Sequence, residues 1–135
     1  MEDFTIGMAQ DEEDFCDTAQ VIKKIFPHAN LGFSPSNYYF YAKVKKGIVG
    51  FAHVIGKEGG TFILQGIGVL PEFRGRGIGS RLADAAIKFC EKKGALKIFL
   101  QVQCTNPAIL IYLKKGFYVK KISSDSYTLE RREPS

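Results

Sequence analysis

Residues 69–82, which read VLPEFRGRGIGSRL, decide the fold of this chain. An apolar strand runs into Pro71, a turn of glycines and arginines follows, and an apolar helix begins after the turn. Such a junction presents free backbone N–H groups at the positive end of a helix dipole, where phosphate groups bind. The segment therefore predicts a sheet covered by helices, with a phosphate site at the start of one helix.

The glycine spacing of this turn separates it from two common phosphate-binding turns. It lacks the GxxxxGK pattern of a P-loop, and its GxGxG run differs from the GxGxxG of dinucleotide-binding turns. Gly75 and Gly77 permit positive φ or close approach of a ligand, and we expect Gly79 to let the turn pack close to the preceding strand. The phosphate-binding candidates are Arg74, Gly75, Arg76, Gly77, Ile78, Gly79 and Ser80. The alternative is a glycine-rich turn that only leads into a helix.

Two glycines, Gly66 and Gly68, interrupt the strand that precedes the turn. Glycine weakens a strand, so it usually marks a bulge or a place where another backbone comes close. We expect a ligand with amide groups of its own, such as pantetheine, to lie along this strand.

Apolar periodicity divides the whole chain into short elements. Expected strands are 4–9, 38–45, 48–55, 61–69, 96–103, 117–122 and 127–131, and expected helices are 11–26, 77–93 and 107–115. In the first helix we expect Ile22 and Phe26 on the buried face. The order β-α-β-β-β-α-β-α-β-β predicts one α/β (or α+β) domain over residues 1–135, with a mixed sheet and helices on both faces.

Composition and charge narrow the class of partner. The 135 residues are 45% hydrophobic and 24% charged, which is ordinary for a globular domain. No apolar run approaches the length of a membrane helix and the N-terminus is acidic, so we expect a cytoplasmic protein without membrane contact. Residues 1–17 carry seven acidic and no basic residues, whereas the rest carries 19 basic and seven acidic ones. This basic body indicates an anionic partner or only a solvated surface, and the chain lacks the patterns of a nucleic-acid-binding domain.

The cysteines and histidines favour neither disulfides nor metal. Cys16, Cys90 and Cys104 lie far apart without a CxxC pair, which indicates reduced thiols, and we expect Cys104 to be a small buried residue. His28 and His53 are the only histidines of the sequence, so no metal site is expected.

Two motifs together resemble the GNAT-type N-acetyltransferases. The acyl-CoA motif of that family, Q/R-x-x-G-x-G/A after a strand ending in V-x-P, is matched by residues 69–71 (VLP) and 74–79 (RGRGIG). The second motif of the family, A-I-x-L-Y-x-x-x-G-F, is matched by residues 108–117 (AILIYLKKGF). The expected order of elements also agrees, so the resemblance covers nearly the whole chain.

The resemblance implies a mostly antiparallel sheet of six to seven strands, acetyl-CoA as acetyl donor, and a primary amine of a protein, peptide or small molecule as acceptor. It implies that residues 74–80 cradle the pyrophosphate and that the strands 61–69 and 96–103 split apart around the thioester. The backbone groups implied to bind pantetheine are those of Ile67, Gly68 and Val69. A splayed strand pair leaves one ladder unpaired, and an amide-bearing cofactor can fill it.

The same resemblance implies catalytic roles for a few side chains. Tyr112 would give a proton or a hydrogen bond to the departing thiolate of CoA; otherwise it is a packing tyrosine. Family members that acetylate protein N-termini often carry a glutamate where this chain has Gln101, which cannot take a proton. Glu72 and His53 are alternative bases, directly or through water, unless the amine arrives deprotonated. A backbone N–H near Val69 would hold the developing oxyanion.

The remaining assignments stay open. The family places a cofactor-binding asparagine three residues before the motif alanine, where this chain has Thr105, so Asn106 is the candidate. We expect the acceptor to contact residues 29–37 and 123–126, in an open groove that suits a peptide tail or a polyamine. A non-catalytic acyl-CoA-binding module of the same fold is the alternative function, and the sequence does not decide between a monomer and a homodimer.

Overall fold

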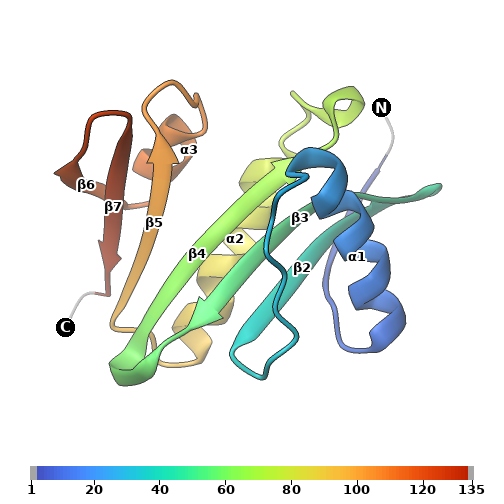
Figure 1. The fold of residues 1–135 in the computed structure, drawn as a ribbon, viewed down its shortest axis with the longest axis horizontal. Coiled ribbons are helices and arrows are strands. Elements are labelled where there is room, and N and C mark those ends of the chain that lie inside the picture. Colours follow the sequence, from blue (N-terminus) through green and yellow to red (C-terminus); the bar gives the residue numbers. More distant parts are fainter. Residues whose placement is uncertain (1–2, 134–135) are drawn as a thin grey trace.

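The computed structural model describes residues 3–133 and shows a seven-stranded sheet with helices on both faces (Figure 1). The strands are β1 (Thr5–Met8), β2 (Asn37–Val44), β3 (Gly47–Gly56), β4 (Thr61–Val69), β5 (Lys97–Gln103), β6 (Tyr118–Ile122) and β7 (Ser126–Arg132). The helices are α1 (Glu12–Ile25), α2 (Ile78–Lys92) and α3 (Ile109–Lys114). The sheet order is β1-β2-β3-β4-β5-β7-β6, and only the β4–β5 pair is parallel among the strand pairs of the described residues. The predicted mixed and mostly antiparallel sheet is confirmed.

Helix α1 begins at a capped end and covers one face of the sheet. The Asp11 carboxylate accepts a hydrogen bond from the Asp14 N–H at 2.8 Å, and three acidic residues in the first turn complement the helix dipole. The helix buries Ile22 in a core cluster with Tyr39 and Phe51. Phe26 is 46% exposed, so its predicted place on the buried face is wrong. The helix ends at Ile25, and the next side chain therefore leaves the helical face.

Helix α2 covers the opposite face and packs on the larger core. It buries Leu82, Ala86 and Cys90 there, together with inward side chains of β2 to β5. Gly77 precedes the helix with φ 82° and Gly94 follows it with φ 82°, so both ends use the left-handed conformation that glycine adopts without strain. The predicted helix over 77–93 is confirmed within one residue at each end.

Strand β4 carries a bulge where the sequence places Gly66. His53 on β3 pairs with Gly66, whereas the next residue, Val54, pairs with Leu64, so Gln65 is an extra residue in the strand. The expected bulge at Gly66 is therefore confirmed. At Gly68 an added Cβ would lie 2.8 Å from the Phe51 ring, so the protein's own core already requires glycine at that position.

Strands β4 and β5 pair at one end only and then separate. Their backbone pairing consists of Thr61 with Lys97, Phe62 with Ile98 and Ile63 with Phe99, and it stops there. Figure 1 shows the two strands diverging toward the end at which β4 leads into the turn before α2. The predicted V-shaped split is present, and β4 beyond Ile63 has no β5 neighbour along that edge.

Candidate active site

The turn between β4 and α2 is held by its own arginines. A 3-10 turn over Pro71–Phe73 follows β4, and Arg74 Nε donates to the Val69 carbonyl at 2.9 Å. Arg76 Nη2 donates to the Glu72 carbonyl at 3.3 Å, and its guanidinium lies 5.0 Å from the centre of the Phe73 ring. These contacts hold the turn in a compact conformation and place the guanidinium groups of Arg74 and Arg76 beside its backbone.

The glycines of the turn leave open space above free N–H groups. Gly75 and Gly77 have φ of 79° and 82°, and a Cβ added at either would meet nothing within 4 Å. In the described chain no backbone carbonyl accepts from the N–H of Gly75, Arg76 or Gly77. The first turn of α2 adds its own unpaired N–H groups, those of Ile78, Gly79 and Ser80. An anion of phosphate size fits such a cradle.

The reason expected for Gly79 is wrong. A Cβ at this position would lie 3.8 Å from the Val69 side chain, which is ordinary van der Waals contact. The packing of the turn on the strand therefore tolerates a larger residue, because the helix starts far enough from β4.

Tyr112 lies near the C-terminal end of α3 and is 7% exposed. Its ring packs edge-on against Phe117, with ring centres 5.8 Å apart. Burial raises the pKa of Tyr112 to about 12, so the phenol stays protonated at neutral pH. Among residues 3–133 no hydrogen bond is made to its hydroxyl, so this group is a donor without a partner in the protein.

The loop before α3 shows what Asn106 and its neighbours do. The Asn106 side-chain carbonyl accepts from the Ala108 N–H at 2.9 Å, which leaves the amide NH2 group free to donate. Thr105 and Cys104 are both exposed, so the expected burial of Cys104 is wrong. The strand ends at Gln103, and the side chains after it follow a surface loop.

A pocket of about 410 Å³ lies beside the bulge of β4. It is lined by Ile22, by residues 25–31, and by Phe51, His53, Gln65 and Gly66. Its lining contains no Asp, Glu, Lys or Arg. It therefore suits an uncharged group that approaches β4 from the face of the sheet covered by α1.

Of the alternative bases, only His53 lines this pocket. His53 is 4% exposed, stacks on Tyr39 with ring centres 4.2 Å apart, and has Nε2 2.7 Å from Asn37 Oδ1. Burial lowers its pKa to about 4. Glu72 is exposed, and no ion pair of the described residues involves it, so it does not pair with Arg74. Gln101 is exposed on β5, at a level where β4 has already separated.

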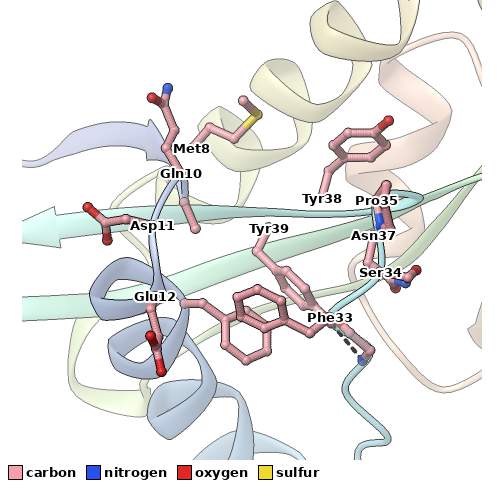
Figure 2. A pocket seen from close by; sticks show the side chains of 13 residues that line it. Met8, Gln10, Asp11, Glu12, Phe33, Ser34, Pro35, Asn37, Tyr38 and Tyr39 are labelled. Atoms are coloured by element: carbon pink, nitrogen blue, oxygen red, sulfur yellow. Dashed lines mark hydrogen bonds between the residues drawn. The ribbon is translucent and has the colours of Figure 1, made fainter.

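A second pocket, of about 620 Å³, lies between the end of β1, the start of α1 and residues 32–37 (Figure 2). The Phe15 ring packs against both Phe33 and Tyr39 there, with ring centres 4.1 Å and 5.1 Å apart, and the Tyr39 hydroxyl donates to the Gly32 carbonyl at 2.9 Å. Part of the segment 29–37, which we expect to contact the acceptor, therefore lines this pocket. Tyr39 also stacks on His53, so one aromatic pair stands between the two pockets.

The described residues contain neither a membrane-spanning helix nor a cluster of metal-binding side chains. No helix within 3–133 is long and apolar enough to cross a membrane. Within the same residues, no group of three or more His, Cys, Asp or Glu side chains could hold a metal ion.

A split strand pair beside an open turn with free N–H groups is the arrangement expected of a protein that binds an extended, phosphate-bearing cofactor. Comparison with known proteins agrees: the sequence profile of the acetyltransferase (GNAT) family matches residues 6–117. The N-alpha-acetyltransferase RimI of Mycobacterium tuberculosis is 33% identical over 111 residues, which cover 73% of this chain and 68% of RimI. The chain belongs to the GNAT acetyltransferase family.

Solved structures show the same fold at low sequence identity. The ribosomal-protein-S18-alanine N-acetyltransferase of Escherichia coli superposes with a TM-score of 0.79 at 19% identity, covering 96% of this chain and 93% of that one. The PaiA N-acetyltransferase of Thermoplasma acidophilum, solved with coenzyme A, gives 0.72 at 18% identity and covers 96% and 99%. The chain is thus an acetyl-CoA-dependent N-acetyltransferase, and the predicted enzyme class, acetyl donor and amine acceptor are confirmed.

Proposed function

We propose that this enzyme acetylates the α-amino group at the N-terminus of a polypeptide. One observation carries the proposal: beyond Ile63, β4 has a free edge with an open phosphate-type turn at its end and an uncharged pocket beside its bulge. Donor and acceptor can therefore reach the same stretch of β4 from different sides. The named activity of the similar RimI protein, N-alpha-acetylation, supports this acceptor class.

The donor fits the free edge of β4 and the turn that follows. The backbone of Ile67, Gly68 and Val69 would bind pantetheine, because β3 occupies only the other edge of the strand there. The diphosphate would lie on the turn, and Asn106 would donate its free amide NH2 group to the cofactor. Residues proposed for the phosphates are Arg74, Gly75, Arg76, Gly77, Ile78, Gly79 and Ser80. Bound acetyl-CoA supplies the activated acetyl group, a thioester.

Tyr112 would act on the departing sulfur. Its protonated phenol can give a hydrogen bond or a proton to the thiolate, and a positioned acid of this kind contributes about 100-fold or more to the rate. A backbone N–H near Val69 would hold the carbonyl oxygen of the acetyl group. Gln101, in place of a glutamate, cannot take the amine proton, so the enzyme works best on an amine that is already neutral.

The uncharged pocket selects among amines by their basicity. An α-amino group has a pKa of about 8 and a lysine side chain one of about 10.4, so several hundredfold more of the former is neutral near pH 7. A pocket without a carboxylate offers no counter-charge to an ammonium group. These two facts favour α-amines over lysines, and apolar lining residues such as Ile25 and Leu31 favour a small uncharged first side chain.

The test is an acceptor screen with acetyl-CoA. Its panel holds a peptide with a free N-terminal alanine, the same peptide with a blocked N-terminus and an internal lysine, and spermidine. We expect release of free CoA and a mass increase of one acetyl group with the first peptide only. Acetylation of lysine or spermidine alone would overturn the acceptor class. Binding of acetyl-CoA without turnover of any amine would instead favour the non-catalytic module.

Tyr112→Phe tests the proposed acid in the same assay. We expect kcat to fall by about 100-fold while the affinity for acetyl-CoA, measured by calorimetry, stays within about twofold. Tyr41→Phe is the matched control, because Tyr41 lies on β2 away from β4 and β5. Full activity of Tyr112→Phe would remove Tyr112 from this role.

Three statements stay predictions: the single domain over 1–135, the cytoplasmic location, and the absence of a nucleic-acid partner. Whether the protein forms a homodimer stays open.

A further inference from the structure

We infer that Nδ1 of His53 accepts a hydrogen bond from the amine of the acceptor and aims the nitrogen lone pair at the thioester. The inference rests on the proposed function and names the side chain that orients the amine. His53 lies in the middle of the sheet, directly opposite Gly66 at the bulge of β4. It is also part of the lining of the uncharged pocket, together with Gln65 and Gly66.

The neighbours of His53 decide which ring nitrogen carries the proton. Asn37 Nδ2 donates to Ser34 Oγ at 2.7 Å, so the other atom of this amide, Oδ1, faces His53. A carbonyl oxygen only accepts, and therefore His53 Nε2 is the N–H that donates to it at 2.7 Å. Because a neutral imidazole has one N–H, Nδ1 holds a lone pair.

Nδ1 of His53 has no hydrogen-bond partner among the described residues, and it is not fully buried. Among residues 3–133, every fully buried side-chain nitrogen or oxygen has a hydrogen-bond partner. None of these residues makes a hydrogen bond with Nδ1 of His53, so this atom is within reach of small molecules in the pocket that His53 lines. With 4% of its surface exposed, the ring presents one acceptor atom in a wall that contains no Asp, Glu, Lys or Arg.

This arrangement orients an amine but does not hold its proton. Burial keeps the pKa of His53 near 4, so the imidazole is neutral and remains an acceptor when the substrate enters. As the C–N bond forms and the C–S bond breaks, the amine proton goes to water, the thiolate takes a proton from Tyr112, and Tyr112 regains one from water. His53 itself stays uncharged throughout, since an imidazolium in this position would lack a counter-charge.

The titratable groups around His53 are few. Tyr39 stacks on its ring from β2, and burial raises the pKa of that phenol. His28 belongs to the lining of the same pocket, while α1 contributes only Ile22 and Ile25 to it. On the other side of the Tyr39–His53 pair, Asp11 and Glu12 line the second pocket with Asn37.

A spectroscopic test needs no turnover. In protein with 15N-labelled histidine near pH 7, we expect Nε2 protonated and Nδ1 unprotonated for His53. A peptide with a free N-terminal alanine, added with CoA, should shift the Nδ1 resonance, and the same peptide with an acetylated N-terminus should not. A protonated Nδ1, or equal shifts with both peptides, would overturn the inference even if no amine were acetylated.

Two variants carry the kinetic test. His53→Phe keeps an aromatic ring beside Tyr39 and removes the acceptor; kcat/KM should fall by about fivefold or more, with unchanged affinity for acetyl-CoA. Asn37→Asp places a carboxylate on Nε2–H, which raises the pKa of His53, so activity should fall more steeply below about pH 7 than in the wild type. That extra fall should vanish in Asn37→Asp/His53→Phe. Two outcomes would overturn the inference but not the proposed function. The first is an active wild type together with unaltered kinetics of His53→Phe. The second is an extra loss of activity at low pH that persists in the double variant.

Discussion

Lys115 Nζ lies 2.7 Å from Asp84 Oδ1, and this ion pair joins the end of α3 to α2. The two helices belong to different arms of the split sheet, because α2 packs on β2 to β4 whereas α3 lies behind β5 (Figure 1). Arg131 Nε on β7 also donates to the Lys115 carbonyl at 2.9 Å. The contact therefore sets the position of the helix that carries Tyr112 relative to the phosphate turn.

We expect Lys115→Met to lower kcat several-fold through displacement of α3, with little change in acetyl-CoA affinity. The free energy of unfolding should fall by less than about 1 kcal/mol, because the Asp84 side chain is 47% exposed and water screens the pair. Chemical denaturation and steady-state kinetics measure both effects. The exchanged pair Asp84→Lys/Lys115→Asp should recover part of the lost kcat; no recovery would show that the pair does not position α3.

Gly77→Glu tests the phosphate cradle. A side chain there points into open space above the free N–H groups, so a carboxylate would meet the diphosphate and weaken acetyl-CoA binding by about 100-fold or more. Gly94→Glu is the matched control, because Gly94 has the same φ of 82° and nothing within 4 Å, at the other end of α2. Both variants bear the same backbone strain of about 1–2 kcal/mol. Calorimetry that finds equal affinities for both would place the diphosphate elsewhere.

Glu130 is a carboxylate covered by three neighbouring side chains. It accepts hydrogen bonds from Tyr118, from Lys120 at 3.1 Å and from Arg132 at 2.8 Å. Burial acts to raise the pKa of Glu130, and these hydrogen bonds outweigh it and lower that pKa to about 2. A carboxylate with a lowered folded-state pKa stabilises the fold above its ordinary pKa and loses that contribution as pH falls through the folded value.

Glu130→Gln should therefore lower the free energy of unfolding by about 1 kcal/mol at neutral pH, since the cations that cover the carboxylate are themselves near the surface. The gap between wild type and variant should close as the pH falls from about 4.5 to about 2. Thermal unfolding across that range measures it. If the difference in unfolding free energy between wild type and variant did not depend on pH, the shape of the side chain, rather than its charge, would explain it.

His53 also loses its contribution to stability as pH falls, but over a higher range of pH than Glu130. Its folded-state pKa of about 4 lies below the ordinary value of 6.5, so the unfolded chain binds the proton first. The fold is fully stable above about pH 6.5 and loses up to about 3 kcal/mol from this group as pH falls toward 4. In His53→Phe the slope of stability against pH between these values should be smaller. An unchanged slope would contradict the burial of a neutral His53.

Much of the fold could be predicted because its signals are local. The turn at 74–80 could be predicted from Gly75 and Gly77, because positive φ values are a property of a few consecutive residues. The bulge at Gly66 and the left-handed end of α2 at Gly94 follow from the same kind of signal. Errors arose where an element ended: Phe26 and Cys104 lie just past a helix and a strand, and periodicity cannot tell which residue is the last of an element.

Contacts between side chains of different strands were beyond such reasoning. Asn37 and His53 are 16 residues apart and meet because β2 and β3 pair in one particular register. Glu130 is covered by residues of the neighbouring strand β6, and no pattern along β7 marks it.

Sequence patterns were enough to place the backbone: which segments are strands and helices, where the chain turns, and that a glycine turn leads into α2. Those features depend on the conformational preferences of neighbouring residues and on dipoles within one element. The folded arrangement was needed to show that His53 is buried and neutral, that it lines a pocket, and that Lys115 joins the helix of Tyr112 to α2. Burial, pKa and ion pairing depend on which distant segments pack together, because each is set by everything within a few ångströms of the side chain.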